Sequence, residues 1–144
     1  LAGLRLGYVA GDPEVIHNLY KVRTVNDVNS MSILCADEIL KHPEIIDDYV
    51  AQIEAGEAVL RLALPELGLE MLPTHANFVV VRVVQIGQPY QFVKALKSHG
   101  YLIRALESEC MADYIRITLG SPEMMRHLAT SLKEIITSGE LNQQ

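Results

Sequence analysis

The sequence predicts an α/β fold of the α+β type, with a three-stranded sheet covered by helices. Apolar residues recur at helical spacing through residues 31–64. Three apolar or β-branched runs follow at residues 75–83, 101–105 and 113–119, and Pro and Gly separate them from further helices. The 144 residues, 49% of them hydrophobic, fit one domain, or one domain with part of another.

The first 30 residues are expected to hold a strand, a helix and a loop. Apart from Arg5, residues 4–10 are largely apolar, which is typical of a short buried strand. Asp12, Pro13 and Glu14 then supply an N-cap, a proline at the first helical position and an acidic first turn, so a helix of about ten residues should follow. Its inner face would carry Val15, Ile16 and Leu19. Residues 24–30 are polar and β-branched, which indicates a loop ending in an N-cap serine.

The helical run of residues 31–64 is expected to contain two helices, or one broken helix. Pro43 lacks a backbone donor and clashes with the preceding turn, so we expect the break at His42. The second helix should be long, with Pro65 and Gly68 marking its end.

The rest of the chain alternates strands with helices. A helix is expected over residues 89–98, with Gly100 as its C-terminal cap and the strand at 101–105 directly after it. Residues 120–123, Gly-Ser-Pro-Glu, open the final helix. The apolar positions expected to face inward on that helix are Met124, Met125, Leu128, Leu132, Ile135 and Ile136.

Composition excludes several classes of protein. The net charge of −6 argues against a non-specific nucleic-acid surface, and no apolar run is long enough to span a bilayer. Cys35 and Cys110 lie far apart without a CxxC spacing, and nothing resembles a signal peptide, so a reducing cytoplasm is expected. The five histidines show no metal-ligand spacing, so no metal site is expected.

Four segments carry a resemblance to a known family. Residues 1–8 resemble the Gly-Leu-x-Gly-Leu-Arg-x-Gly-Tyr segment of class I and II aminotransferases, which depend on pyridoxal phosphate. Residues 76–78 (Ala-Asn-Phe), 100–104 (Gly-Tyr-Leu-Ile-Arg) and 114–120 (Tyr-Ile-Arg-Ile-Thr-Leu-Gly) match the histidinol-phosphate aminotransferase branch in order and at suitable distances. Four matches in the same order over nearly the whole chain are specific evidence for this resemblance, whereas one match alone would be weak evidence.

The resemblance implies a fold, an activity and an assembly. Residues 1–30 would be the C-terminal tail of the large, pyridoxal-phosphate-binding domain of fold type I, with its last strand and helix. Residues 31–144 would be a connecting helix and the small C-terminal domain. The parent enzyme would act in amino-acid biosynthesis as a homodimer, and would transfer an amino group between an amino acid or histidinol phosphate and a 2-oxo acid.

The resemblance also assigns roles to arginines. Arg5 matches the residue that binds the cofactor phosphate, and a guanidinium suits this role because it stays charged and has several fixed donors. Arg116 matches the arginine that binds the substrate's carboxylate, or its phosphate ester in the histidinol-phosphate branch. Arg104 resembles a second anion-binding arginine. The structural alternatives are a solvated strand-start arginine for Arg5, a salt bridge to Asp113 for Arg116, and surface pairing for Arg104.

Two further residues have weaker assignments. Asn77 is a candidate substrate-binding residue, and its alternative role is to cap a turn at the start of a strand. Tyr8 lies beside the expected cofactor site, but a tyrosine at the end of an apolar strand is more often a core residue with a satisfied hydroxyl.

The main departure from the family pattern is that the lysine that forms a Schiff base with the cofactor is missing from this sequence. That lysine is expected upstream of Leu1. The lysines present are interpreted as solvated charges on helices: Lys21, Lys41, Lys94, Lys97 and Lys133. This chain alone is therefore expected to be inactive. Two alternatives remain: a separate, non-catalytic small domain used in binding or assembly, and a related pyridoxal-phosphate enzyme such as a phosphothreonine decarboxylase.

Overall fold

The computed structural model describes residues 2–24 and 28–142. The chain divides into two compact units, one up to Asp47 and the other from Asp48 onward, and the long helix α3 (Pro43–Glu66) contributes to both. The first unit also contains the short 3-10 helix η1 (Ala2–Leu4), helix α1 (Pro13–Val22) and helix α2 (Ser30–Leu40).

The predicted strand at residues 4–10 is wrong. The chain forms η1 and then continues to Gly11 without regular structure, and Arg5 has a φ of 52°, which is incompatible with a strand. A strand also needs a neighbouring strand to hydrogen-bond with, and no strand is assigned among the described residues of the first unit. The apolar pattern of this segment therefore does not reflect a sheet within this chain.

The helices of the first unit begin and end near their predicted positions. Asp12 caps α1, and its side chain accepts a hydrogen bond from the Glu14 amide. The N-cap of α2 is Asn29, not the predicted serine, and part of the expected loop, residues 25–27, lies outside the described residues. The predicted break before Pro43 is confirmed, since α2 ends at Leu40 and α3 begins at Pro43. The expected inner face of α1 is not buried.

The second unit contains a four-stranded antiparallel sheet. Its strands are β1 (Glu70–Met71), β2 (Phe78–Arg82), β3 (Arg104–Ala105) and β4 (Tyr114–Thr118), in the order β1-β2-β4-β3. The prediction of three strands is corrected by β1, which sequence patterns miss because it is two residues long and not β-branched. The other three strands form within their predicted ranges but are shorter.

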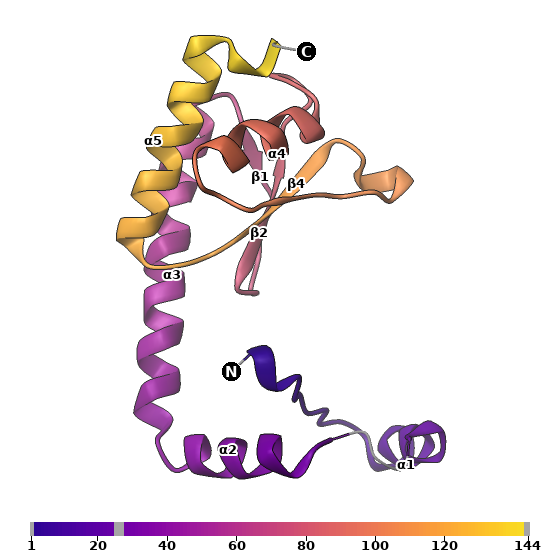
Figure 1. The fold of residues 1–144 in the computed structure, drawn as a ribbon. Helices are drawn as coiled ribbons and strands as arrows, with labels where there is room; N and C mark the ends of the chain where they lie inside the picture. Colours follow the sequence, from indigo (N-terminus) through magenta and orange to yellow (C-terminus); the bar gives the residue numbers. More distant parts are fainter. Residues whose placement is uncertain (1, 25–27, 143–144) are drawn as a thin grey trace. The chain divides into compact units, whose positions relative to one another are not determined.

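One face of this sheet forms the core. Alternate residues of the central strands, Val79 and Val81 on β2 and Ile115 and Ile117 on β4, are buried. They belong to one apolar cluster with the second half of α3, with α4 (Pro89–Ser98) and with α5 (Pro122–Ser138) (Figure 1). Most predicted inward positions of α5 are buried, but Met124 is 53% exposed, whereas the neighbouring Met125 is buried. The core therefore lies between the sheet and these helices.

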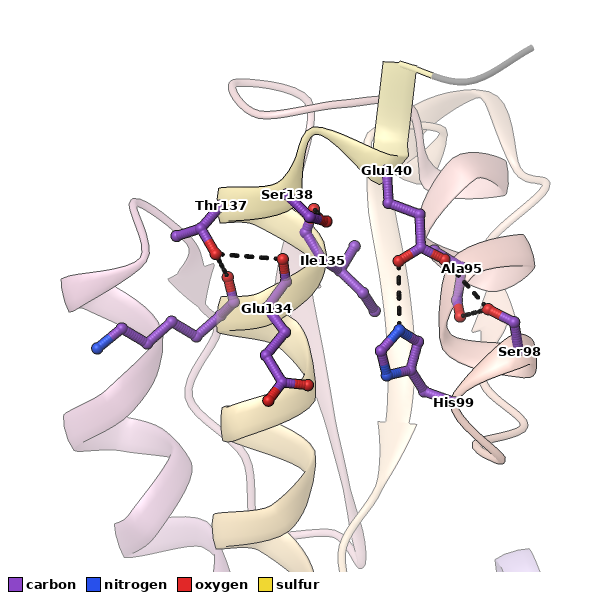
Figure 2. Close-up of polar contacts among 9 residues, drawn as sticks. Ala95, Ser98, His99, Glu134, Ile135, Thr137, Ser138 and Glu140 are labelled. Carbon is purple, nitrogen blue, oxygen red and sulfur yellow. Dashed lines mark hydrogen bonds and ion pairs between the residues drawn. The ribbon is translucent and has the colours of Figure 1, made fainter.

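The C-terminal 3-10 helix η3 (Glu140–Asn142) docks on the end of α4. Glu140 Oε2 lies 3.2 Å from His99 Nε2, and Glu140 Oε1 accepts a hydrogen bond from Ser98 Oγ at 3.2 Å (Figure 2). The neighbouring Leu141 is buried in the core. Gly139, with a φ of 72°, ends α5 and turns the chain into this segment.

We expect Glu140→Ala to destabilise the chain by about 0.5–1 kcal/mol, because it removes the carboxylate that contacts the half-buried His99 and one of the two acceptors of the exposed Ser98 hydroxyl. Urea denaturation of the variant would measure this change. Glu134→Ala is the matched control, since Glu134 is exposed on α5, and it should leave the free energy of unfolding nearly unchanged. Equal effects of the two substitutions would contradict the docking role of Glu140.

In the part of the chain that the structure describes, no helix is both long and apolar enough to cross a membrane.

Candidate functional site

The second face of the sheet carries the arginines that the sequence singles out. On β4, Arg116 alternates with the buried Ile115 and Ile117, so its side chain lies on the face opposite the core. Arg104 on β3 is the direct antiparallel partner of Arg116. Directly opposed residues share a face, with Cβ atoms roughly 5 Å apart, so two guanidinium side chains are neighbours on this surface.

The carboxylates of the described residues form no ion pair with this arginine pair. Like charges directly opposite each other on neighbouring strands are destabilising, and no described acidic residue forms an ion pair with either arginine. Asp113, the alternative partner for Arg116, instead pairs with Arg82 at 3.5 Å. An anion with several oxygen atoms, such as a carboxylate or a phosphate ester, would relieve this repulsion.

Phe78 orients the guanidinium of Arg116. The guanidinium carbon lies 5.3 Å from the centre of the Phe78 ring, a distance typical of a cation–π contact. A guanidinium stacked on an aromatic face keeps its in-plane N–H donors free for a ligand. Arg116 is half-buried and Arg104 is exposed, so the pair combines a partly desolvated arginine with one open to solvent.

Arg82 is a third arginine on this face, and no sequence motif pointed to it. Its guanidinium lies 3.9 Å from Glu70 on β1 and 3.5 Å from Asp113 before β4. These contacts neutralise Arg82 and connect three neighbouring segments of the sheet. Arg82 therefore differs from Arg104 and Arg116 in having acidic partners, which the fold brings close to it.

Asn77 lies directly before the start of β2, beside the residue that follows β4. Its carbonyl accepts a hydrogen bond from the Leu119 amide at 2.9 Å, and its side chain is exposed. It lines a cavity of about 190 Å³ together with Tyr49 and Glu54 of α3. No side-chain hydrogen bond caps a turn through Asn77 among the described residues, so its amide is available to a ligand.

Arg5 belongs to the first unit and is exposed. Its φ of 52° makes it the one described residue other than glycine with a positive φ. No ion pair or hydrogen bond of its side chain occurs among the described residues, so its donors are available for an anion. Tyr8 is 93% exposed, so it is not a core residue of the first unit.

The lysines have the surface positions expected of them. Lys41 forms ion pairs with Asp37 at 3.2 Å and Glu38 at 2.9 Å, and these carboxylates raise the pKa of Lys41. A charged, exposed lysine is the opposite of the desolvated amine that covalent catalysis requires. Lys21, Lys94, Lys97 and Lys133 are also exposed. No group of three or more potential metal ligands occurs among the described residues.

Comparison with known proteins identifies the family. The family model described as "Aminotransferase class I and II" matches residues 1–132. The chain therefore belongs to the class I and II aminotransferases. It is 35% identical over 137 residues to histidinol-phosphate aminotransferase 1 of Carboxydothermus hydrogenoformans, an alignment that covers 94% of this chain and 38% of that protein.

Solved structures agree with this assignment. A putative histidinol-phosphate aminotransferase from Erwinia carotovora atroseptica has a TM-score of 0.82 and 25% identity, over 97% of this chain and 40% of that one. Histidinol-phosphate aminotransferase from Sinorhizobium meliloti, solved with pyridoxal 5′-phosphate, has a TM-score of 0.75 and 25% identity. The match covers 96% of this chain and 38% of that one. The fold type I prediction is confirmed, and the chain spans about two fifths of the length of these relatives.

Proposed function

We propose that the whole protein is a pyridoxal-phosphate-dependent aminotransferase, which transfers an amino group between an amino acid or histidinol phosphate and a 2-oxo acid. The observation that carries the proposal is the cross-strand pair Arg104/Arg116, which has no acidic partner within residues 2–24 and 28–142, in a chain of this family. Such a pair suits a substrate that carries a carboxylate or a phosphate ester.

The residues of the first unit fit the cofactor's phosphate. Arg5 offers a permanently charged guanidinium with no internal partner among the described residues. When bound, pyridoxal phosphate supplies an aldehyde that takes up the amino group of the donor and passes it to the acceptor. Arg5 would hold the phosphate, and the lysine that anchors the aldehyde is expected outside this chain, so we assign no catalytic residue within it.

The substrate would bind on the open face of the small sheet. Arg116, held against Phe78, would orient the anionic end of the substrate through two parallel hydrogen bonds. Arg104 would contribute a second charge, and it would matter most for a phosphate ester, which carries more charge than a carboxylate. Asn77 would donate or accept a hydrogen bond from the cavity that it lines beside α3, next to this surface. Binding in a fixed orientation is the contribution of this chain to amino transfer.

We further propose the domain assignment and assembly that the family resemblance implies. Residues 1–30 belong to the large domain and 31–144 to the connecting helix and small domain, in a homodimeric cytoplasmic enzyme. Large apolar side chains exposed in the first unit support the burial of this surface in the whole protein, and they include Val15, Leu19, Met31, Leu34 and Ile45. No membrane or nucleic-acid partner is proposed.

Product analysis tests the proposed reaction. The full-length protein, loaded with pyridoxal phosphate, would be incubated with histidinol phosphate and 2-oxoglutarate, and with phosphothreonine in parallel. We expect glutamate to form from the first mixture and no carbon dioxide from the second. Carbon dioxide release without amino transfer would instead support the decarboxylase alternative, and the absence of both reactions would support the non-catalytic one.

A further inference from the structure

Ser32 is the one buried polar residue found among the described residues, with 1% of its surface exposed. Its hydroxyl donates a hydrogen bond to the backbone carbonyl of Leu4 at 2.8 Å, across 28 positions of the sequence. Both residues belong to the first unit. A buried hydroxyl is retained only where it has a partner, and this partner is the peptide bond that leads into Arg5.

This hydrogen bond acts on the backbone of Arg5. The Leu4 carbonyl lies in the rigid peptide plane that joins Leu4 to Arg5, and rotation of that plane about the N–Cα bond of Arg5 defines its φ. Arg5 has a φ of 52°, in the left-handed region that costs about 1–2 kcal/mol for a residue with a Cβ. The Ser32 hydrogen bond fixes the plane and offsets part of this cost.

The position of Ser32 is itself fixed by the start of α2. The side chain of Asn29 caps the helix by accepting a hydrogen bond from the Ser32 amide at 2.9 Å. Ser32 therefore extends from a capped helix and holds the segment that carries Arg5. Strained backbone held by surrounding structure is a feature of functional sites.

We propose that Ser32 is a positioning residue for Arg5: its hydrogen bond to the Leu4 carbonyl holds Arg5 in the left-handed conformation that aims the guanidinium at the cofactor phosphate. This inference rests on the proposed role of Arg5. Without the hydroxyl, the Leu4–Arg5 peptide is free to rotate, Arg5 relaxes toward negative φ, and the direction of its side chain changes.

The test uses the apo form of the full-length protein, titrated with pyridoxal phosphate to obtain the Kd. We expect Ser32→Ala to raise this Kd by about 3–10-fold, the effect of one hydrogen bond. Ser32→Thr, which keeps the hydroxyl, should restore binding to near the wild-type value. Ser30→Ala is the matched control, because Ser30 is exposed in the same helix turn, and it should leave the Kd unchanged. Melting temperatures identify any variant that fails to fold.

A double-variant cycle separates positioning from a purely structural role. Arg5→Ala should raise the Kd more than Ser32→Ala does, and adding Ser32→Ala to Arg5→Ala should raise it no further. Full additivity of the two substitutions, or an unchanged Kd in a folded Ser32→Ala variant, would overturn the inference while leaving the role of Arg5 intact. An unchanged Kd in Arg5→Ala would instead overturn the proposed phosphate role, and this inference with it.

Discussion

Replacing Arg116 by alanine in the full-length protein is expected to lower kcat/KM for the amino donor by about 100-fold. In the proposed role of Arg116, the substitution would remove a charge-assisted pair of hydrogen bonds to the substrate's anionic group, and such bonds are roughly twice as strong as neutral ones. Arg116→Lys keeps the charge but loses the planar pair of donors, so its loss should be smaller, about tenfold. Steady-state kinetics with the purified, cofactor-loaded variants would measure both values.

Arg126→Ala provides the control for a simple loss of positive charge. Arg126 is exposed on α5, away from strands β3 and β4, so its removal should change kcat/KM less than twofold. If Arg116→Ala behaved like Arg126→Ala, the open face of the sheet would not be the substrate-binding surface.

The substitution Gly56→Ala is expected to destabilise the chain by about 2 kcal/mol, although alanine is the better helix former. Gly56 is buried in α3, and a Cβ at this position would lie 2.1 Å from the carbonyl oxygen of Gly120, in the segment between β4 and α5. Because the obstructing atom belongs to the backbone, the helix or that segment must shift. Urea denaturation of the 144-residue chain would measure the change in the free energy of unfolding.

Ala58→Gly is the matched control for helix propensity. Ala58 is exposed in the same helix, and its replacement by glycine should cost about 1 kcal/mol. Helix propensity alone therefore predicts that Gly56→Ala stabilises the chain and that Ala58→Gly destabilises it. With the close packing of Gly56 against Gly120, both substitutions should destabilise the chain, and Gly56→Ala should do so more. A Gly56→Ala chain as stable as the wild type would contradict this packing.

The elements with strong local signals were predictable from the sequence. The helix over Pro89–Ser98 and the break before Pro43 form where proline and the apolar spacing place them. The segment 4–10 was not predictable. Its apolar residues are typical of a buried strand, whereas Arg5 has a positive φ, in the left-handed region. The two-residue strand β1 was missed because it depends on pairing with β2 rather than on its own residues.

The candidate site was predictable in its residues but not in its geometry. The family resemblance pointed to Arg5, Arg104 and Arg116, but no sequence pattern shows that Arg104 and Arg116 are directly paired across two strands. Nor does the sequence show that Asp113 contacts Arg82 rather than Arg116. The hydrogen bond from Ser32 to Leu4 was equally hidden, because it joins residues 28 positions apart. Contacts of this range depend on the tertiary fold.

The most direct test of the account is the preference of the full-length protein for a phosphorylated donor. The measurement is the ratio of kcat/KM for histidinol phosphate to that for histidinol, which lacks the phosphate, in the wild type and in the double variant Arg104→Ala/Arg116→Ala. If the arginine pair binds the substrate's anion, the wild type strongly prefers histidinol phosphate, and the double variant loses most of that preference. An equally large preference in the double variant would contradict the account, because the phosphate would then bind elsewhere.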